Sequence, residues 1–404
     1  MQVNRDQFLE QGYAILRKVV PPDRLNAMRG VAETMVERRR KIWAREQGPD
    51  DPPEGVYASS PQPRLSVGAT PEIIDAKTAE FVEFWCHENS RGVSSRLLDM
   101  PGAGNTEMMM MCSPLQPHGP AAWHRDIHPF DTAPLQAYIE DILENGPRYV
   151  QWNIPLYDDD VLWVVPGSHV RFNTDEEQEQ LNTDPRVPLP NGIQTHLEAG
   201  DGVVYITPIL HWGSDYSAKL RRTLHGGFSN FNYYTDLKFA EAIAPQARAT
   251  FESWNSQSLR CQDATEAALR AAIAGDGGAY LQGLDRIQSG LGDKGKWMLT
   301  MHLSKAACFV NVNNNPDFNA STQSLHRSAG NAHAITLNWG PDFSRRFTPA
   351  ESTALWQRFA ELDAALQTED HHVASFQGGA VPYEFNRLPE MDMNSFLAGW
   401  GART

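Results

Sequence analysis

The chain has 404 residues, 41% of them hydrophobic, which is enough to bury a large core in one elaborated domain or in two. Its formal charge of −15 argues against a nucleic-acid or anionic-membrane partner, because both attract basic patches. Four cysteines without CxxC spacing, an N-terminus without an apolar stretch and the lack of any run of about eighteen apolar residues predict a cytoplasmic protein with reduced thiols.

The first hundred residues predict helices that brace a sheet. A strand is expected over residues 13–20, and Pro21-Pro22-Asp23 then opens a long helix. A second helix is expected from Thr70-Pro71 towards Leu98. Residues 48–66 between them are rich in Pro, Gly, Ser and Asp and predict an irregular loop, which is either a lid over a site or an ordinary connector.

Two central segments predict strands. Residues 108–111 are four consecutive methionines, which cannot all face one way and therefore indicate core packing. Residues 149–154 alternate between apolar and polar side chains, which places Gln151 and Asn153 on one face. That face lines either solvent or a cavity, where the two amides would contact a co-substrate.

A candidate metal site lies between these strands and continues downstream. In an extended segment, side chains two positions apart project from one face, so His124 and Asp126 would converge, and His211 would supply a third ligand. Two imidazoles and one carboxylate are the ligand set of non-haem Fe(II) oxygenases, which leave coordination positions open for a co-substrate and for O2. A surface salt bridge or a turn would give the same His-x-Asp triplet.

His196-Leu197-Glu198 is a rival for the first two ligands, with the same alternation and the same ligand chemistry. Only fifteen residues and a short Gly-Asp turn separate His196 from His211. Two adjacent antiparallel strands would still bring this rival set together.

A basic residue beyond His211 favours 2-oxoglutarate as the co-substrate. Its distal carboxylate needs a fixed cation, and the planar guanidinium of arginine can bind a carboxylate through two parallel hydrogen bonds. Strand alternation separates two candidates, because Arg221 shares a face with Thr223 and His225, whereas Arg222 shares a face with bulky apolar residues. We therefore expect Arg221 and Thr223 to face the co-substrate, although a solvated strand charge would look the same. Iron, Asp126, dianionic 2-oxoglutarate and Arg221 would then sum to neutrality.

Other residues near these motifs have less defined roles. His128 is a candidate for contacting substrate or supporting a ligand, and His169, in a turn, is expected to be structural. Trp123, Trp163 and Tyr205 would form either an apolar substrate wall or plain core.

Beyond residue 233 the sequence pattern changes from one that predicts strands to one that predicts helices. Residues 235–274 are alanine-rich and predict a helix that ends at Gly275. Thr348-Pro349-Ala350-Glu351 has the capping-box arrangement that opens another helix. Residues 233–404 therefore predict a mainly helical C-terminal extension after a first region over residues 1–232.

Four ordered features carry a family resemblance: His124-x-Asp126, the run Val164-Val165-Pro166-Gly167-Ser168-His169, the Gly-Asp strand at 200–205, and His211 followed by the Arg-Arg pair. Together with residues 6–16, they make residues 5–232 resemble the phytanoyl-CoA dioxygenase family of Fe(II)/2-oxoglutarate oxygenases. The resemblance implies an α+β fold with a double-stranded β-helix (jelly-roll) core and flanking helices. It also implies iron at His124, Asp126 and His211 and the co-substrate carboxylate at Arg221. The acidic turn Tyr157-Asp158-Asp159-Asp160 departs from the Glu-Asn-Gly-like bend usual in the family, and so does the long extension.

The resemblance also implies a reaction. Oxidative decarboxylation of 2-oxoglutarate would release succinate and CO2 and drive hydroxylation of an unactivated C–H bond in a small molecule. Related halogenases carry a small residue where this chain has Asp126, so the carboxylate favours oxygenation. A cupin-like metalloenzyme that does not use 2-oxoglutarate and a non-catalytic jelly-roll binding protein are the alternatives. Neither the substrate nor the oligomeric state is predicted.

Overall fold

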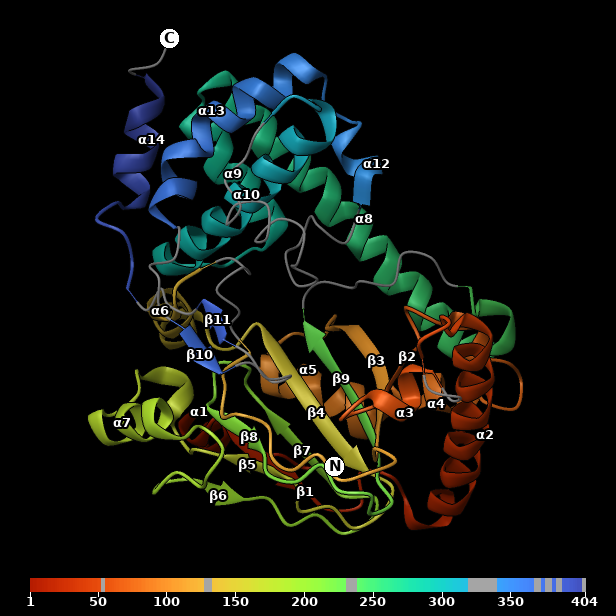
Figure 1. Cartoon of the computed structure of the whole chain (residues 1–404). Coiled ribbons are helices and arrows are strands. Elements are labelled where there is room, and N and C mark those ends of the chain that lie inside the picture. Colours follow the sequence, from red (N-terminus) through yellow and green to blue (C-terminus); the bar gives the residue numbers. More distant parts are fainter. Residues whose placement is uncertain are drawn as a thin grey trace.

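The computed structural model describes residues 1–51, 55–126, 133–229, 238–318, 340–366, 372–374, 380–382 and 387–401. The sheets lie at one end of the molecule and most of the C-terminal helices at the other (Figure 1). The strands are β1 (Tyr13–Leu16), β2 (Arg64–Ser66), β3 (Gly104–Cys112), β4 (Tyr149–Pro155), β5 (Leu162–Val164), β6 (Ile193–Gln194), β7 (Gly202–Tyr205), β8 (His211–Gly213), β9 (Arg222–Ser229), β10 (His372–Ala374) and β11 (Ala380–Pro382).

Two antiparallel sheets form the core of the first region. The larger has the strand order β1-β7-β4-β9-β3-β2 and the smaller has the order β6-β5-β8. Leu162 and Val164 of the smaller sheet pack against Val203 and Tyr205 of the larger one, which holds the two sheets face to face. The expected jelly-roll type of core with flanking helices and a helical C-terminal part is confirmed as an antiparallel sheet core, and in the described residues the two sheets do not close into one barrel.

Helices cover the outer face of the larger sheet. They are α1 (Arg5–Gln11), α2 (Pro22–Glu46), α3 (Val56–Ser59), α4 (Ala79–Phe84) and α5 (Val93–Leu98), with 3-10 turns at Pro71–Ile73, Ser168–Val170 and Ala240–Ala242 and a π-helical turn at Glu88–Gly92. The long helix predicted after Pro21-Pro22 is confirmed. The strand predicted over 13–20 ends at Leu16, and part of the loop predicted over 48–66 is instead α3 and β2.

The continuous helix predicted from Thr70 to Leu98 is wrong. The Thr78 hydroxyl accepts a hydrogen bond from the Asp75 amide at 2.9 Å, and the Asp75 carboxylate accepts one from the Lys77 amide at 2.8 Å. Such side-chain bonds to the backbone compete with helical hydrogen bonds, so the helix begins only at Ala79.

The two faces of β9 differ as its alternation predicts. Leu224 and Phe228 are fully buried in the cluster beneath the helices. Thr223 and His225 are buried on the opposite face, towards the smaller sheet, where His225 lines a cavity. This alternation is what presents polar side chains to the interior between the sheets.

The remaining helices lie mostly in the C-terminal part: α6 (Leu135–Asn145), α7 (Asp175–Thr183), α8 (Pro245–Ala274), α9 (Gly277–Ile287), α10 (Asp293–Asn314), α12 (Gly340–Ser344), α13 (Pro349–Ala365) and α14 (Met393–Gly401). The predicted capping box is present, since Thr348 and Glu351 cap α13 reciprocally. Gly275 ends α8 in the left-handed region at φ 71°. Among the described helices, none is long and apolar enough to cross a membrane.

Two helices join the sheets to the C-terminal helices. In α8, Phe251 and Trp254 belong to the core beneath the sheet, whereas Ala268 and Leu269 belong to the core of the C-terminal helices. Ala137 of α6 also belongs to this second core, although it precedes the predicted boundary at residues 232 and 233 by almost a hundred positions. The boundary itself falls in residues 230–237, outside the described residues.

Candidate metal centre

His124 and His211 lie side by side because their backbones pair. The His124 amide donates to the His211 carbonyl at 3.0 Å, and the His211 amide donates to the His124 carbonyl at 2.9 Å. Between His124 and Asp126, the buried Arg125 points the other way and donates to the Ser168 carbonyl and to Asn173. Anchoring Arg125 in this way leaves its neighbours His124 and Asp126 facing the interior.

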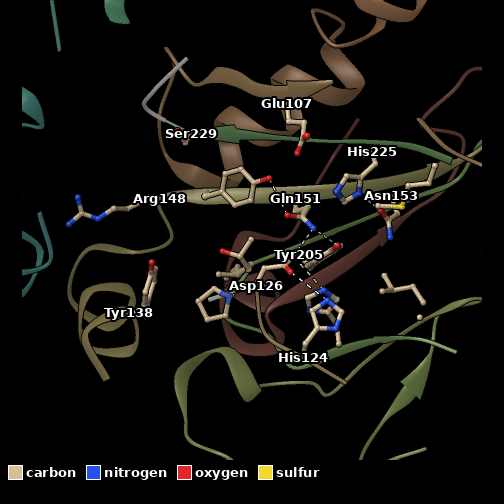
Figure 2. A pocket seen from close by; sticks show the side chains of 18 of the residues that line it. Glu107, His124, Asp126, Tyr138, Arg148, Gln151, Asn153, Tyr205, His225 and Ser229 are labelled. Atoms are coloured by element: carbon tan, nitrogen blue, oxygen red, sulfur yellow. Dashed lines mark hydrogen bonds and ion pairs between the residues drawn. The ribbon is translucent and has the colours of Figure 1, made fainter. Parts of the chain in front are cut away.

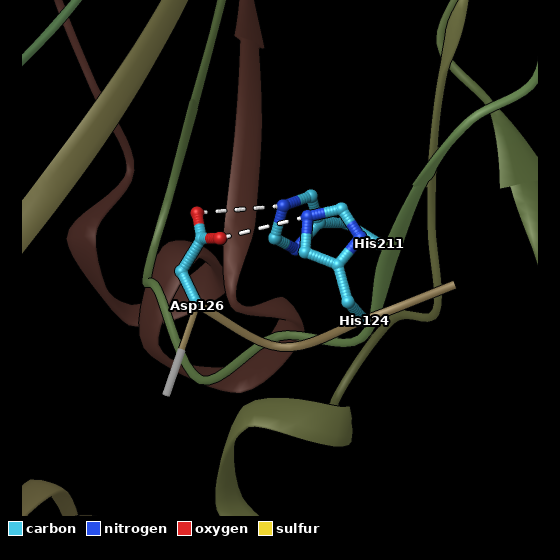
Figure 3. Close-up of side chains that lie close together, drawn as sticks. All are labelled: His124, Asp126 and His211. Atoms are coloured by element: carbon cyan, nitrogen blue, oxygen red, sulfur yellow. Dashed lines mark ion pairs between the residues drawn. The ribbon is translucent and has the colours of Figure 1, made fainter. Parts of the chain in front are cut away.

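The three side chains converge on one point (Figure 3). Asp126 Oδ1 lies 3.5 Å from His124 Nε2, and Asp126 Oδ2 lies 3.5 Å from His211 Nε2. One potential ligand atom from each residue lies within 4.8 Å of the others. Two ligand atoms bonded at about 2.1 Å to one ion, at right angles, would lie about 3 Å apart, so this spacing suits a single metal ion.

The second nitrogen of each imidazole fixes its tautomer. His124 Nδ1 lies 2.9 Å from the Ala122 carbonyl, and His211 Nδ1 lies 3.0 Å from the Ile209 carbonyl. A carbonyl oxygen only accepts hydrogen bonds, so in both rings Nδ1 carries the proton and donates it. Both Nε2 atoms then offer a lone pair towards Asp126, which is how metal-binding histidines are usually oriented.

The rival set is not assembled. His196 and Glu198 are exposed, while Leu197 between them is buried. Within the described ranges, His124, Asp126 and His211 form the one group of at least three His, Cys, Asp or Glu side chains that lie close enough to share a metal ion.

Gln151 lines the cavity and contacts Asp126. Its Nε2 atom donates to Asp126 Oδ2 at 3.0 Å and to the Tyr205 hydroxyl at 2.7 Å, and its Oε1 accepts from the Tyr149 hydroxyl at 3.1 Å (Figure 2). Burial, and next the charge of Asp126, raise the pKa of Tyr205, which stays a neutral phenol. These bonds hold the Asp126 carboxylate in one orientation.

Tyr149 occupies its position because β9 has a glycine beneath it. A Cβ atom at Gly227 would lie 2.2 Å from the Tyr149 hydroxyl oxygen and 2.3 Å from ring atoms. Any larger residue there would displace the ring. Gly227 therefore supports the hydrogen-bond chain that ends at Asp126.

Arg221 lines the same cavity and is held by an aspartate that the sequence reasoning missed. Its Nε donates to Asp159 Oδ2 at 2.6 Å, and the Thr223 hydroxyl donates to the same oxygen at 3.0 Å. Burial acts to raise the pKa of Asp159, but the charge and hydrogen bond of Arg221 hold that pKa below its usual value. Asp159 comes from the acidic turn that departs from the family pattern, so this turn has a defined contact in the site.

One nitrogen of Arg221 is left without a partner. Its Nη1 atom is buried and makes no hydrogen bond to the described residues. A buried guanidinium N–H without an acceptor costs free energy unless a ligand accepts from it. Arg222 instead points to the outer side of the sheet, where its Nε lies 2.9 Å from Glu33 Oε1 on α2.

The charges of iron, Asp126, 2-oxoglutarate and Arg221 were expected to cancel, but this charge balance omits the carboxylate of Asp159. The cavity, of about 260 Å³, also has the charged side chains of Arg64 on β2 and Glu107 on β3 in its wall. Neither was singled out from the sequence; for Arg64 the reason is that β2 falls within the segment expected to be a loop. Arg64 donates to Gln62 Oε1 at 3.1 and 2.8 Å.

The other predicted residues have protein partners. Asn153 Oδ1 lies 2.6 Å from His225 Nδ1, and burial lowers the pKa of His225 to about 3, so this ring is neutral and donates to the amide. His169 is buried and donates from Nε2 to the Leu9 carbonyl at 2.9 Å, which makes it structural as expected. Trp123 stacks on Trp212 at 5.3 Å between ring centroids. His128 lies outside the described residues.

A family model described as Phytanoyl-CoA dioxygenase (PhyH) matches residues 8–223, more than half of the chain. The chain belongs to this family. The match includes His124, Asp126, His211 and Arg221 and ends at Thr223. The protein is therefore a non-haem iron, 2-oxoglutarate-dependent oxygenase, and its Fe(II) and 2-oxoglutarate agree with the donor set described above.

Several solved structures are similar to part of the chain. The 2-oxoglutarate-dependent epimerase SnoN from nogalamycin biosynthesis is 17% identical, with 56% of this chain and 81% of that chain covered and a TM-score of 0.37. AviO1 from Streptomyces viridochromogenes Tue57 is 20% identical, with 57% and 96% covered and a TM-score of 0.37. EctD from S. alaskensis is 14% identical, with 56% and 75% covered and a TM-score of 0.38. No curated protein matches the chain.

Proposed function

We propose that this oxygenase hydroxylates an unactivated C–H bond of a small molecule, with release of succinate and CO2, at a metal held by His124, Asp126 and His211. The observation that carries the proposal is the pair of imidazoles with protonated Nδ1 atoms and with Nε2 atoms turned towards one carboxylate. When bound, the iron and 2-oxoglutarate together supply the oxidising chemistry that activates O2.

The side chains around the site hold and orient these groups. Gln151 fixes the Asp126 carboxylate through the 3.0 Å hydrogen bond to Oδ2. Asp159 and Thr223 fix Arg221 so that its unpartnered Nη1 is available to the distal carboxylate of 2-oxoglutarate. In this proposal Gln151 and Thr223 are positioning residues, and Asn153 positions the neutral imidazole of His225 beside the co-substrate.

The proposal of hydroxylation rests on Asp126. Its carboxylate occupies the position at which a halogenase needs an unfilled coordination site for halide, so an oxygen-derived outcome is favoured. Tyr205, His211 and Gln151 beside the site are buried, whereas His124 and Asp126 are partly exposed.

An anaerobic titration of the chain with Fe(II) and 2-oxoglutarate tests the binding roles. We expect a visible charge-transfer band in the wild type, loss of iron in His124→Ala, and retention of both in His196→Ala. Retained iron in His124→Ala, together with its loss in His196→Ala, would overturn the assignment of the ligands.

Arg221→Met and Arg222→Met are matched variants for the co-substrate. Loss of one charge-assisted carboxylate contact of roughly 1.5–3 kcal/mol predicts about a ten- to hundredfold weaker 2-oxoglutarate affinity in Arg221→Met. Arg222→Met should keep the wild-type affinity, because Arg222 contacts Glu33 on the outer face. The reverse result would place the co-substrate elsewhere. A metabolite screen for stimulated succinate release, followed by mass analysis of the product, then tests hydroxylation itself.

A further inference from the structure

The cavity does not end at the metal residues but continues to the C-terminal helices. Tyr138 and Ile142 of α6 line it, as do Met298, Leu299 and His302 of α10. Figure 2 shows Tyr138 and Arg148 on the side of the cavity away from Asn153 and His225. Helix α10 lies wholly beyond residue 223, where the family match ends, whereas α6 lies within the matched residues.

The charged groups at this distal end already neutralise one another. Arg148 pairs with Asp141 through two nitrogens and donates from Nη1 to Gln288 Oε1 at 2.7 Å. Asp141 is buried and Arg148 is largely covered. The guanidinium therefore has its acceptors within the protein and is not presented as a cation for an anionic ligand.

His302 supplies a hydrogen-bonding atom without a partner. Its Nε2 atom is buried and makes no hydrogen bond to the described residues. Burial, followed by the positive charges of Arg148 and Lys305, lowers the pKa of His302 to about 3, so the ring is neutral. A buried polar atom without a partner costs free energy, and a neutral imidazole can satisfy itself with a hydroxyl, carbonyl or amide.

The charge of the described residues around the cavity also favours an uncharged ligand. Among the described residues, four carboxylates, of Asp126, Glu107, Asp141 and Asp159, lie in or against its wall, compared with three guanidinium groups, of Arg64, Arg148 and Arg221. Fe(II) and the 2-oxoglutarate dianion cancel, so the described residues give the loaded site about one net negative charge. Such a site disfavours an anionic substrate. Ile142, Met298 and Leu299 contribute apolar side chains to this end of the cavity.

We propose that α6 and α10 close the distal end of the substrate pocket, and that His302 binds an uncharged hydroxyl, carbonyl or amide group at the far end of an otherwise apolar substrate. This inference rests on the proposed function for its account of turnover, but the recognition of the ligand is testable without iron. His302 is in this view a specificity-determining residue.

The test measures binding of three probes of one shape to the metal-free, full-length chain by ligand-observed NMR. Benzamide is neutral and polar, benzoate is anionic and toluene is apolar. We expect benzamide to bind more tightly than toluene, and only benzamide to depend on His302. His302→Leu should weaken benzamide about three- to tenfold, the value of one hydrogen bond to an uncharged group, and leave toluene unchanged.

Three further variants locate the effect. His302→Gln keeps a donor and an acceptor and should restore most of the benzamide affinity. Leu299→Trp should fill the distal end and weaken benzamide and toluene alike, and the exposed control His196→Leu should change neither. Benzoate binding that depends on His302, or equal benzamide affinity in wild type and His302→Leu, would overturn the proposal. Because the chain carries no metal in this experiment, failure of the iron or 2-oxoglutarate titrations leaves its outcome unaffected.

Discussion

At the scale of single residues, the site depends on contacts that orient groups rather than on the reacting groups alone. Asp159 illustrates this, because its buried carboxylate holds Arg221 at 2.6 Å and accepts from Thr223 as well. The pair is almost fully covered, with side-chain exposures of 10% for Arg221 and 5% for Asp159. Removal of either charge therefore leaves the other without compensation in a region of low dielectric.

Asp159→Asn should lower the free energy of unfolding of the ligand-free chain by about 3–5 kcal/mol, because a buried guanidinium loses its counter-charge. 2-Oxoglutarate would supply a replacement negative charge, so its addition should raise the melting temperature of Asp159→Asn by more than that of the wild type. Thermal unfolding with and without 2-oxoglutarate measures both effects. An equal ligand-induced shift in the two proteins would argue against contact between the co-substrate and Arg221.

His169 predicts how stability depends on pH. Burial lowers its pKa to about 4, whereas the unfolded chain titrates this group near 6.5. Between these two values the unfolded state binds a proton that the folded state does not, so stability rises with pH across this window and is lost as the pH falls. His169 alone should contribute a slope of roughly 1.4 kcal/mol per pH unit.

His169→Gln isolates that contribution. The variant should be less stable than the wild type at pH 7, but its free energy of unfolding should fall less steeply between pH 6 and pH 4.5. Urea unfolding at several pH values gives the slope. Identical slopes in the two proteins would mean that His169 takes up its proton in the folded state as readily as in the unfolded state.

At the scale of elements, the two faces of strand β9 have different roles. Leu224 and Phe228 anchor it beneath the helices, while Thr223 donates to Asp159 and His225 lines the cavity. The adjacent residues Gly226 and Gly227 also meet different neighbours. A Cβ at Gly226 would lie 2.2 Å from the Glu107 carbonyl oxygen on β3, and one at Gly227 would meet the Tyr149 side chain.

Gly226→Ala and Gly227→Ala should therefore differ in kind. Gly226→Ala pushes against the backbone of a paired strand and should destabilise the fold by about 1–3 kcal/mol. Gly227→Ala displaces only the end of a side chain, so it should cost less stability but disturb the Tyr149–Gln151–Asp126 contacts and weaken Fe(II) binding. Denaturant unfolding and iron titration of both variants separate these outcomes, and equal effects on both measurements would contradict the division.

At the scale of the whole molecule, the C-terminal helices form a second core with its own buried ion pair. Lys305 Nζ on α10 lies 3.2 Å from Asp363 Oδ1 on α13, and both side chains are essentially inaccessible to solvent. Lys305→Met should cost about 3–5 kcal/mol, since it leaves Asp363 buried and unpaired. Lys305→Met/Asp363→Leu should recover much of that loss. Chemical unfolding would measure both, and a double variant as unstable as the single one would show that the pair itself is required.

The parts of this architecture that the sequence predicts are those determined by neighbouring residues. The alternation of Arg221 and Arg222, the convergence of His124 and Asp126, and the cap at Thr348 each depend on a few adjacent positions. Asp159 and His302 could not be found in this way. Asp159 acts through Arg221, which lies more than sixty positions further along the chain. His302 shares the cavity with residues of α6, which lies more than a hundred and fifty positions before it. The path of the whole chain, not the local sequence, brings these residues together.

The position of α6 has a consequence for synthesis of the protein. Helix α6 spans Leu135–Asn145, but α10, against which it packs, begins only at Asp293, about 150 residues later. At roughly 5–20 residues per second, a ribosome needs about 8–30 s to supply that partner. During this interval the apolar face of α6 has no α10 to cover it. A nascent chain paused before residue 293 should therefore be a better client for chaperones than one paused after residue 314.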